Sequence, residues 1–140
     1  MEKLGLDKVG SVTKLTVKGS INSYDVIQFR DKMPLLRELD LTDATVVASD
    51  KAFYSGSCTG DNSLGDNTFR GLSNLNLVKL PRGLNRIGSC MFQDCGNLKS
   101  IENSDVVTSI GYSAFSGCGN LEHLTLPDGL EAIEGWTFAN

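Results

Sequence analysis

The sequence has one histidine, His123, and only 3 prolines among 140 residues. A hydrolytic triad needs a histidine beside a nucleophile and an acid, and His123 lies on a predicted strand, pointing outward. None of the four cysteines forms a CxxC pair, so no zinc site is predicted. The glycine-rich stretch GDNSLGDN has no lysine, which a phosphate-binding loop of the P-loop type needs. These absences weigh against an enzyme and predict no catalytic residue, no metal and no cofactor.

The sequence also has no long apolar run and no excess of positive charge. A membrane-spanning helix needs roughly 18 or more consecutive apolar residues, and no window approaches that length. The formal net charge is -4 and the pI about 4.9, with no basic stripe of the kind that binds phosphates. We therefore expect neither membrane insertion nor a nucleic-acid partner. The opening residues MEKLGLDKVG contain no secretory signal, which says little about location, because a fragment would have lost its signal.

The composition is that of a folded domain. Hydrophobic residues make up 40% and charged residues 21%, and the 15 glycines predict many turns. We expect residues 1–140 to form a single domain.

A repeat of 23 residues runs through the C-terminal half. One phrase, FQDCGNLKSI, begins at Phe92 and returns as FSGCGNLEHL at Phe115. A constant period over several columns predicts a solenoid, in which each coil buries its apolar face against the next. The columns that we expect to form the repeat core are Phe69, Phe92, Phe115 and Phe138; Asn74, Asn97 and Asn120; and Leu75, Leu98 and Leu121.

Stacked coils place like side chains over one another about 4.8 Å apart. We expect the phenylalanines to form an aligned spine. The asparagines either satisfy backbone groups as a ladder or are ordinary solvated turn residues. Cys95 and Cys118 occupy one column, so they are interpreted as buried free thiols; pairing of Cys90 with Cys95, or of either with Cys58, stays open.

Each regular coil contains two short extended segments separated by a corner. Alternation in LVKLP and HLTLP predicts the first strand, and LNRIG, VTSIG and LEAIE predict the second. Pro81 with Gly83 marks the corner of one coil. In the middle coil Asn103 replaces the usual leucine, which predicts a looser or bulged corner.

The N-terminal half carries the same pattern less regularly. The segment SYDVIQFRDKM predicts a short amphipathic helix over Tyr24–Lys32, with Ser23 as N-cap and Pro34 in the connection. This helix either replaces a loop of the first coil or caps the end of the stack. We divide the chain into N-terminal coils with the helix (1–45), an insertion loop (46–68) and regular repeats (69–140). A calcium loop in the insertion is only a weak alternative, because the final glutamate of that motif is missing.

The segments GLNRIGSCMFQDCGNLKSI, VTSIGYSAFSGCGNLEHLTLP and LPDGLEAIEGWTFAN resemble the BspA-like leucine-rich repeats of bacterial surface proteins. The pattern aliphatic-x-x-Ile-Gly-x-x-x-Phe-x-x-Cys-x-x-Leu carries the resemblance over residues 69–140. Leu72 and Glu134 depart from it, where the family has cysteine and glycine. The resemblance implies a strand-dominated α/β solenoid, a right-handed leucine-rich-repeat superhelix, and a location outside a bacterial cell or on its surface.

The resemblance also implies binding rather than catalysis: adhesion to a host or bacterial surface protein or glycan. The alternative is a spacer without its own ligand. The ligand-binding candidates are outward residues of the first strands, expected on the concave face, namely Glu38, Asp40, Lys79, Glu102, His123 and Thr125. A plain solvated sheet face explains the same residues, because strands expose alternate side chains. The chain stops at WTFAN as a new unit begins, so we expect either a truncated solenoid or a partner molecule that covers Trp136 and Phe138. End-to-end self-association through the open C-terminal coil is one way to provide that cover.

Overall fold

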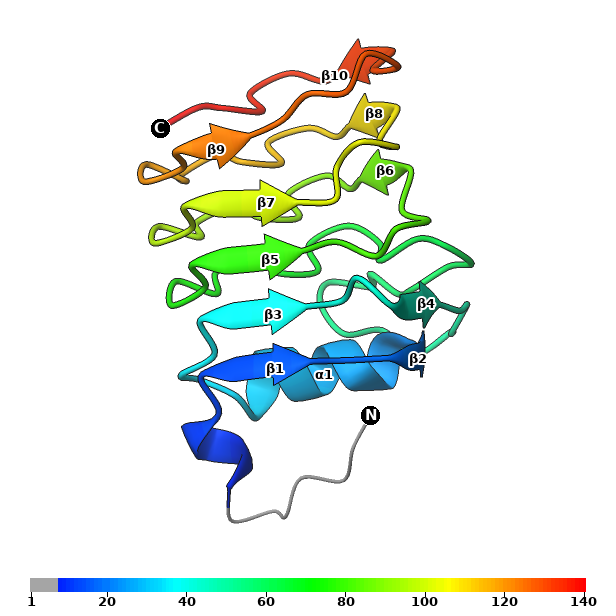
Figure 1. Ribbon diagram of the computed structural model, residues 1–140, viewed down its shortest axis with the longest axis vertical. Coiled ribbons are helices and arrows are strands. Elements are labelled where there is room, and N and C mark those ends of the chain that lie inside the picture. Colours follow the sequence, from blue (N-terminus) through cyan, green and yellow to red (C-terminus); the bar gives the residue numbers. More distant parts are fainter. Residues whose placement is uncertain (1–7) are drawn as a thin grey trace.

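The chain forms a right-handed solenoid that rises by one coil per repeat (Figure 1). The computed structural model describes residues 8–140. Along the chain the elements are η1 (Val9–Ser11), β1 (Lys14–Thr16), β2 (Gly19–Ile21), α1 (Ser23–Asp31), β3 (Glu38–Asp40), β4 (Ala44–Val46), β5 (Leu77–Lys79), β6 (Arg86–Ile87), β7 (Ser100–Glu102), β8 (Ser109–Ile110), β9 (His123–Leu124) and β10 (Ala132–Ile133). The predicted strand-dominated solenoid is confirmed.

Two faces of the solenoid carry parallel sheets. The first strand of every coil joins one five-stranded sheet, in the order β1-β3-β5-β7-β9. Its register places Leu39 beside Val78 and Val78 beside Ile101, so the inward residues form one continuous aliphatic column. The second face is divided into a pair, β2-β4, and a triplet, β6-β8-β10. The division falls where the insertion enters the stack.

The phenylalanine spine is present as predicted. Ring centroids lie 5.3 Å apart from Phe69 to Phe92 and from Phe92 to Phe115, and 5.6 Å apart from Phe115 to Phe138. Three of the rings are fully buried, whereas Phe138 in the last coil is 50% exposed. Burying one such side chain contributes about 1.5–3 kcal/mol, so the spine is a main source of stability.

The asparagine column forms a ladder rather than a row of solvated turn residues. Asn74 donates its side-chain amide to the carbonyl of Pro34 at 2.8 Å. Asn97 donates to Ser73 at 2.8 Å, and Asn120 donates to the Gly96 carbonyl. Each amide therefore satisfies a carbonyl of the preceding coil, and the column ties consecutive coils together.

The cysteine column has a similar role inside the core. The Cys95 thiol donates to the carbonyl of Phe69, and the Cys118 thiol donates to that of Phe92, both at 3.0 Å. All four cysteines are free, so the interpretation of this pair as buried thiols holds and no disulfide is formed. At Leu72 the column is apolar, and this side chain packs partly buried against the core.

The helix begins one residue earlier than predicted, and its N-cap is Asn22 rather than Ser23. Asn22 accepts from the Tyr24 amide at 2.9 Å while Asp25 accepts from the Asn22 amide, which completes a capping box. Ser23 instead lies fully buried, and its hydroxyl accepts from the backbone N–H of Thr59 at 2.9 Å. A partner far along the chain thus decides which of two neighbouring cap-forming residues caps the helix.

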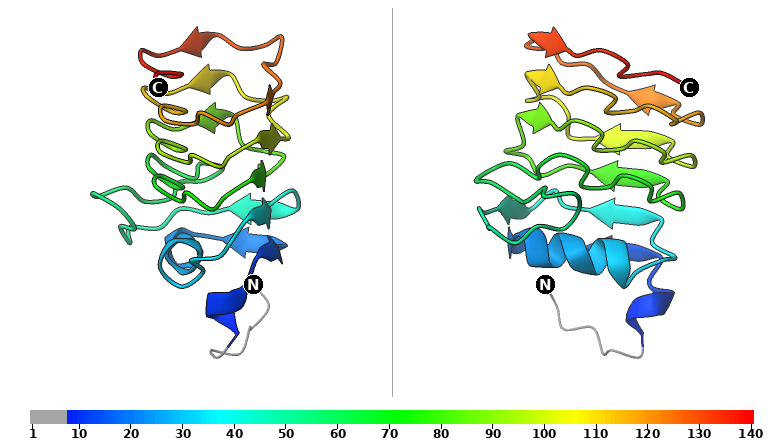
Figure 2. Two further views of the ribbon diagram at one scale, coloured as in Figure 1. Left: turned by 90° about the vertical axis from the view of Figure 1, so that its left-hand side faces the viewer. Right: turned by 180° about the vertical axis from the view of Figure 1, so that it is seen from behind.

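The insertion is shorter than the predicted range 46–68. Val46 belongs to β4, and the 23-residue columns already resume at Leu64, which is fully buried in the column of Ile87 and Ile110. Asn62 donates its backbone N–H to the carbonyl of Val46 at 2.9 Å. The end of the insertion therefore supplies a rung between β4 and β6, and only its central part projects from the stack (Figure 2).

Backbone conformation repeats with the same period. Asn67, Cys90, Ser113 and Trp136, spaced by 23 residues, all have left-handed φ angles between 53° and 60°. The predicted bulge in the middle coil is also a left-handed residue, Asn103, with φ 65°. Its side-chain amide donates to the carbonyl oxygen of Leu80 at 3.0 Å and to the hydroxyl of Thr42 at 2.9 Å. That corner is bulged but fixed to both coils beneath it.

Candidate interaction surfaces

The predicted ligand-binding residues lie on the outer face of the five-stranded sheet. The backbone register places Glu38 beside Leu77 and Asp40 beside Lys79. Lys79 is in turn beside Glu102. The predicted rows therefore exist, because parallel strands in register stack equivalent positions. His123 extends one row at β9 and is exposed, and the exposed Thr125 follows β9 directly.

Two ion pairs cross between neighbouring strands of this face. Lys14 lies 3.2 Å from Glu38, and Lys79 lies 3.3 Å from Glu102. Exposed pairs of this kind contribute only about 0.2–1 kcal/mol to stability. Their main effect here is that the sheet face neutralises much of its own charge.

Asp40 is more constrained than its neighbours. Its carboxylate accepts from the backbone N–H of Thr42 at 3.0 Å, forming a turn directly after β3. Burial alone would raise the pKa of Asp40, but hydrogen bonds from Thr42 and the charges of Lys79 and Lys18 bring that pKa below its ordinary value. Asp40 is thus an ionised, fixed acceptor at the C-terminal end of β3.

A shallow pocket of about 170 Å³ opens over β1, β3 and β5. Its polar lining includes Lys14, Glu38, Asp40 and Lys79, and Leu77 supplies an apolar side chain. Glu102, His123 and Thr125 lie outside it. The structure therefore brings three of the six predicted residues to one pocket and spreads the others along the sheet.

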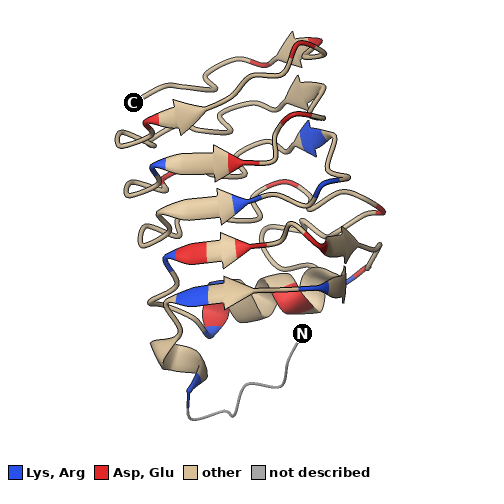
Figure 3. Cartoon of the chain, in the orientation of Figure 1, with Lys and Arg blue, Asp and Glu red and all other residues tan. Residues whose placement is uncertain are grey.

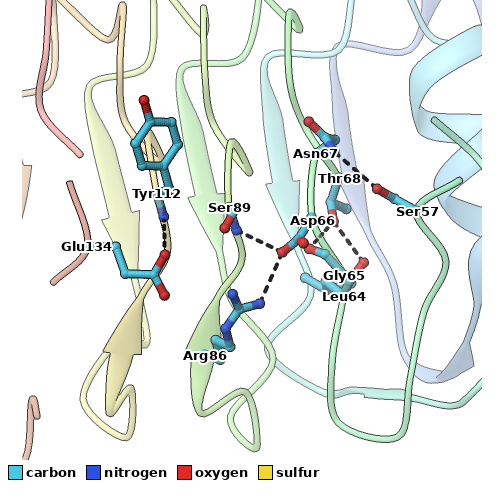
Figure 4. A network of polar contacts seen from close by, with 10 residues as sticks. All are labelled: Ser57, Leu64, Gly65, Asp66, Asn67, Thr68, Arg86, Ser89, Tyr112 and Glu134. Atoms are coloured by element: carbon cyan, nitrogen blue, oxygen red, sulfur yellow. Dashed lines mark hydrogen bonds and ion pairs between the residues drawn. The ribbon is translucent and has the colours of Figure 1, made fainter. Parts of the chain in front are cut away.

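A second polar surface, which was not predicted, lies where the insertion meets β6 (Figure 4). Arg86 donates to Asp66 Oδ1 at 3.0 Å, and the Ser89 amide donates to the same oxygen at 2.8 Å. Asn67 donates to the hydroxyl of Ser57 at 3.1 Å. The sequence feature that could have revealed this surface is the column of Asp66, Ser89 and Tyr112, which continues the 23-residue spacing upstream of Phe69.

The insertion is also fixed to the helix. The Arg30 guanidinium lies 4.8 Å from the centre of the Tyr54 ring, and that of Arg70 lies 5.7 Å from it. Cation–π contacts of this kind contribute about 0.5–2 kcal/mol. The projecting part of the chain is therefore positioned by two arginines.

Basic residues are confined to the N-terminal part of the solenoid, whereas acidic residues continue to its C-terminal end (Figure 3). The last basic residue is Lys99. The acidic residues after it are Glu102, Asp105, Glu122, Asp128, Glu131 and Glu134. The last two coils therefore carry a negative field that disfavours anionic partners.

Residues 8–140 show neither a metal centre nor a membrane-spanning helix. This part of the chain contains no group of three or more His, Cys, Asp or Glu side chains arranged to hold a metal ion. Within the same residues, no helix has the length and apolarity required to cross a bilayer. In the C-terminal coil predicted for self-association, Trp136 and Phe138 are 69% and 50% exposed; the role of this coil stays a prediction.

Parallel strands, an asparagine ladder and a stacked phenylalanine spine define a leucine-rich-repeat solenoid. The model of the BspA type leucine rich repeat region matches residues 58–140 with 6 copies, and the chain belongs to this family. A crystal structure of a leucine-rich repeat protein from Bacteroides ovatus ATCC 8483 has a similar fold, with a TM-score of 0.51 and 24% sequence identity. That similarity covers 91% of this chain but only 22% of the other. No curated protein matches the chain.

Proposed function

We propose that this domain is a non-catalytic adhesion module of the bacterial surface that binds a protein or glycan through the outer face of its five-stranded sheet. Family membership supports the coarser part, a repeat module for interaction. Proteins with BspA-type repeats are typically associated with the bacterial surface. The supporting observation is the continuous, in-register sheet face, along which polar side chains repeat from β1 to β9.

The centre of the proposed interface is the pocket over β1, β3 and β5. Asp40 presents a fixed carboxylate there beside Lys79, and Lys79 forms an ion pair with Glu102 on the neighbouring strand β7. Leu77 supplies an apolar contact between the charged positions. An ordered acceptor with charges of both signs suits a polar partner surface, because complementarity favours specificity and association rate more than affinity.

The experiment compares two triple variants on arrays of glycans and extracellular-matrix proteins. Asp40→Asn, Lys79→Ala and Glu102→Ala together change the proposed interface, and Asn at position 40 still provides a side-chain oxygen for the turn. The matched control changes Asp43→Asn and Arg82→Gln, an exposed pair at 3.8 Å outside the sheet face, together with Asp128→Asn. Binding that is lost only in the first variant supports the proposal. Binding that survives in both variants contradicts this location.

The internal pairing of the sheet charges favours a second function, that of a spacer. Lys14 is paired with Glu38, and Lys79 with Glu102. The sheet-face rows carry none of the aromatic or arginine side chains that dominate strong interfaces. If the wild-type domain binds nothing on the arrays, the spacer is the better conclusion.

A further inference from the structure

We propose that the insertion and β6 together form a binding site for a neutral sugar, at which Asp66 and Arg86 hold neighbouring hydroxyl groups of one ring. The site is an open pocket of about 390 Å³ lined by Ser55, Ser57, Cys58, Asp66 and Arg86, with Gly56 and Gly65. This volume falls within the range of roughly 300–1,000 Å³ usual for small-molecule sites. Four of these residues, Ser57, Gly65, Asp66 and Arg86, are labelled in Figure 4.

The polar groups of this pocket are fixed before any ligand arrives. Asp66 is held by two donors, the Arg86 guanidinium and the Ser89 amide. Ser57 is held by the side chain of Asn67. Preorganised side chains lose little conformational freedom on binding, which improves affinity.

Hydrogen-bonding capacity remains on the Asp66–Arg86 pair. Both of the Asp66 bonds end on Oδ1, and Oδ2 is left to accept a further donor. Arg86 donates from Nη1, and its guanidinium has other N–H groups. The two side chains are 45% and 40% exposed, so solvent-borne groups reach them. An adjacent acceptor and donor match two neighbouring hydroxyls, one donating and one accepting.

The lining selects among ligand classes. Asp66 neutralises Arg86, which disfavours a phosphate or sulfate that needs net positive charge. Serine, cysteine, charged residues and glycine make up the lining, with no aliphatic or aromatic side chain. A peptide anchor depends on apolar burial, whereas a polyhydroxylated ring is recognised by polar contacts. The composition therefore favours a neutral sugar over an anion or a peptide.

The walls of the pocket are held together by close backbone packing. A side chain at Gly65 would meet the carbonyl oxygen of Cys58, and Gly65 has φ 85°. A Cβ at Gly88 would lie 2.5 Å from the Gly65 carbonyl oxygen. Insertion and repeat thus approach so closely that only glycine fits at both positions. Because Gly65 lines the pocket, this contact places the insertion wall directly against the repeat.

This site is separate from the sheet face and independent of the function proposed for it. The insertion projects from the side of the solenoid opposite the five-stranded sheet (Figure 2). A result at one surface therefore does not decide the other.

The test titrates the 15N-labelled domain with the methyl glycosides of glucose, galactose, mannose and N-acetylglucosamine, and follows backbone amide shifts. At least one glycoside is expected to shift the amides of Ser57, Cys58 and Asp66 in a saturable way, with a Kd on the order of millimolar. Asp66→Asn and Arg86→Gln are expected to weaken binding about tenfold or more. Asp43→Asn and Arg82→Gln, an equivalent pair outside the pocket, are expected to leave it unchanged.

Three results would overturn the proposal: no glycoside shifts these amides, binding persists in a folded Arg86→Gln variant, or N-acetylglycinamide binds there in place of sugars. A second experiment covers the case in which the Asp66 or Arg86 variants do not fold. Cys58 is exposed in the pocket, so its alkylation with N-phenylmaleimide fills the pocket of the wild-type fold. Mass spectrometry verifies that Cys58 alone is labelled. Loss of glycoside binding is expected, and binding that survives labelling rejects this site.

Discussion

Arg30 donates from Nη1 to the carbonyl oxygen of Arg70 at 3.0 Å, across the junction between α1 and the first regular coil. The same nitrogen contacts the carbonyls of Thr68 at 3.0 Å and Asn67 at 3.2 Å. In the next coil the carbonyls equivalent to Thr68 and Arg70 accept from backbone N–H groups of the coil below. The helix offers no such donors, so one guanidinium replaces a rung of backbone hydrogen bonds.

Arg30→Met is therefore expected to destabilise the domain by about 2–4 kcal/mol, because it leaves partly buried carbonyls without donors. Arg30→Lys is expected to lie between the methionine variant and wild type, since an ammonium keeps the charge but not the planar geometry. Urea unfolding followed by circular dichroism measures both. The control is Arg82→Met at an exposed position, expected to change stability by less than about 0.5 kcal/mol. An Arg30→Met variant as stable as this control would contradict the assigned role.

Asp94 occupies a column in which its neighbours are glycines. Gly71, Asp94 and Gly117 have φ angles of 75°, 61° and 75°, so all three are left-handed. A non-glycine residue is disfavoured there. Asp94→Gly is expected to stabilise the fold by about 0.5–1 kcal/mol, observed as a higher urea midpoint with an unchanged slope.

The reverse change tests the same column. A Cβ at Gly117 would lie 2.7 Å from Asp94 Oδ1, so Gly117→Ala is expected to destabilise. Part of that loss should disappear in an Asp94→Gly background, which removes the facing carboxylate. Additive effects in this double-mutant cycle would show that the side-chain contact is irrelevant.

The sequence predicted the periodic features because period is itself a sequence signal. Phe92, Asn97 and Cys95 each recur one coil later, and stacking forces such columns into register. Leu64 was missed because the repeat was counted from Phe69, and the insertion conceals the earlier rung. The N-cap was misplaced because Asn22 and Ser23 both suit a cap, and only the distant Thr59 decides between them.

The polar surfaces were harder to predict. Rows on the sheet follow from strand alternation, so the outward positions of Glu38 and Lys79 were predictable, while their role in binding stays a prediction. The Asp66–Arg86 pair could have been found only by extending the 23-residue column of Ser89 and Tyr112 upstream to Asp66, and the insertion conceals that continuation. Arg30 was missed for another reason: its partners are backbone carbonyls, which leave no trace in residue identity.

The buried thiols predict a loss of stability at high pH. Burial raises the pKa of Cys95 to about 12 and that of Cys118 to about 11. An unfolded cysteine ionises near pH 8.5. Above that pH the unfolded chain releases these protons and the folded chain keeps them, so stability falls as pH rises, by about 1.4 kcal/mol per pH unit for each thiol.

Urea midpoints of the reduced protein between pH 8 and pH 10.5 measure this dependence. Cys95→Ala with Cys118→Ala is expected to be less stable at neutral pH but to have a shallower alkaline decline. All other ionisable groups are the same in the two proteins, so their contributions cancel in the comparison. Parallel pH profiles for the two proteins would show that the thiols do not contribute.

The asparagine ladder is tested by substitutions at Asn97, one of which makes the loss of stability depend on pH. Asn97 donates from Nδ2 to the carbonyl of Ser73 at 2.8 Å, and at this position only a donor is useful. Asn97→Ala is expected to lose about 1 kcal/mol, the usual net value of such a bond. Asn97→Asp is expected to lose more at pH 7, because an ionised carboxylate has no proton to donate and repels the carbonyl oxygen.

Below about pH 4 the introduced carboxyl group is protonated and is again a donor. The stability deficit of Asn97→Asp relative to wild type should therefore shrink, while that of Asn97→Ala stays constant. Urea unfolding of the three proteins at pH 7 and pH 3.5 measures both deficits, and a deficit of Asn97→Asp that does not depend on pH would mean that the ladder is not held by this donor.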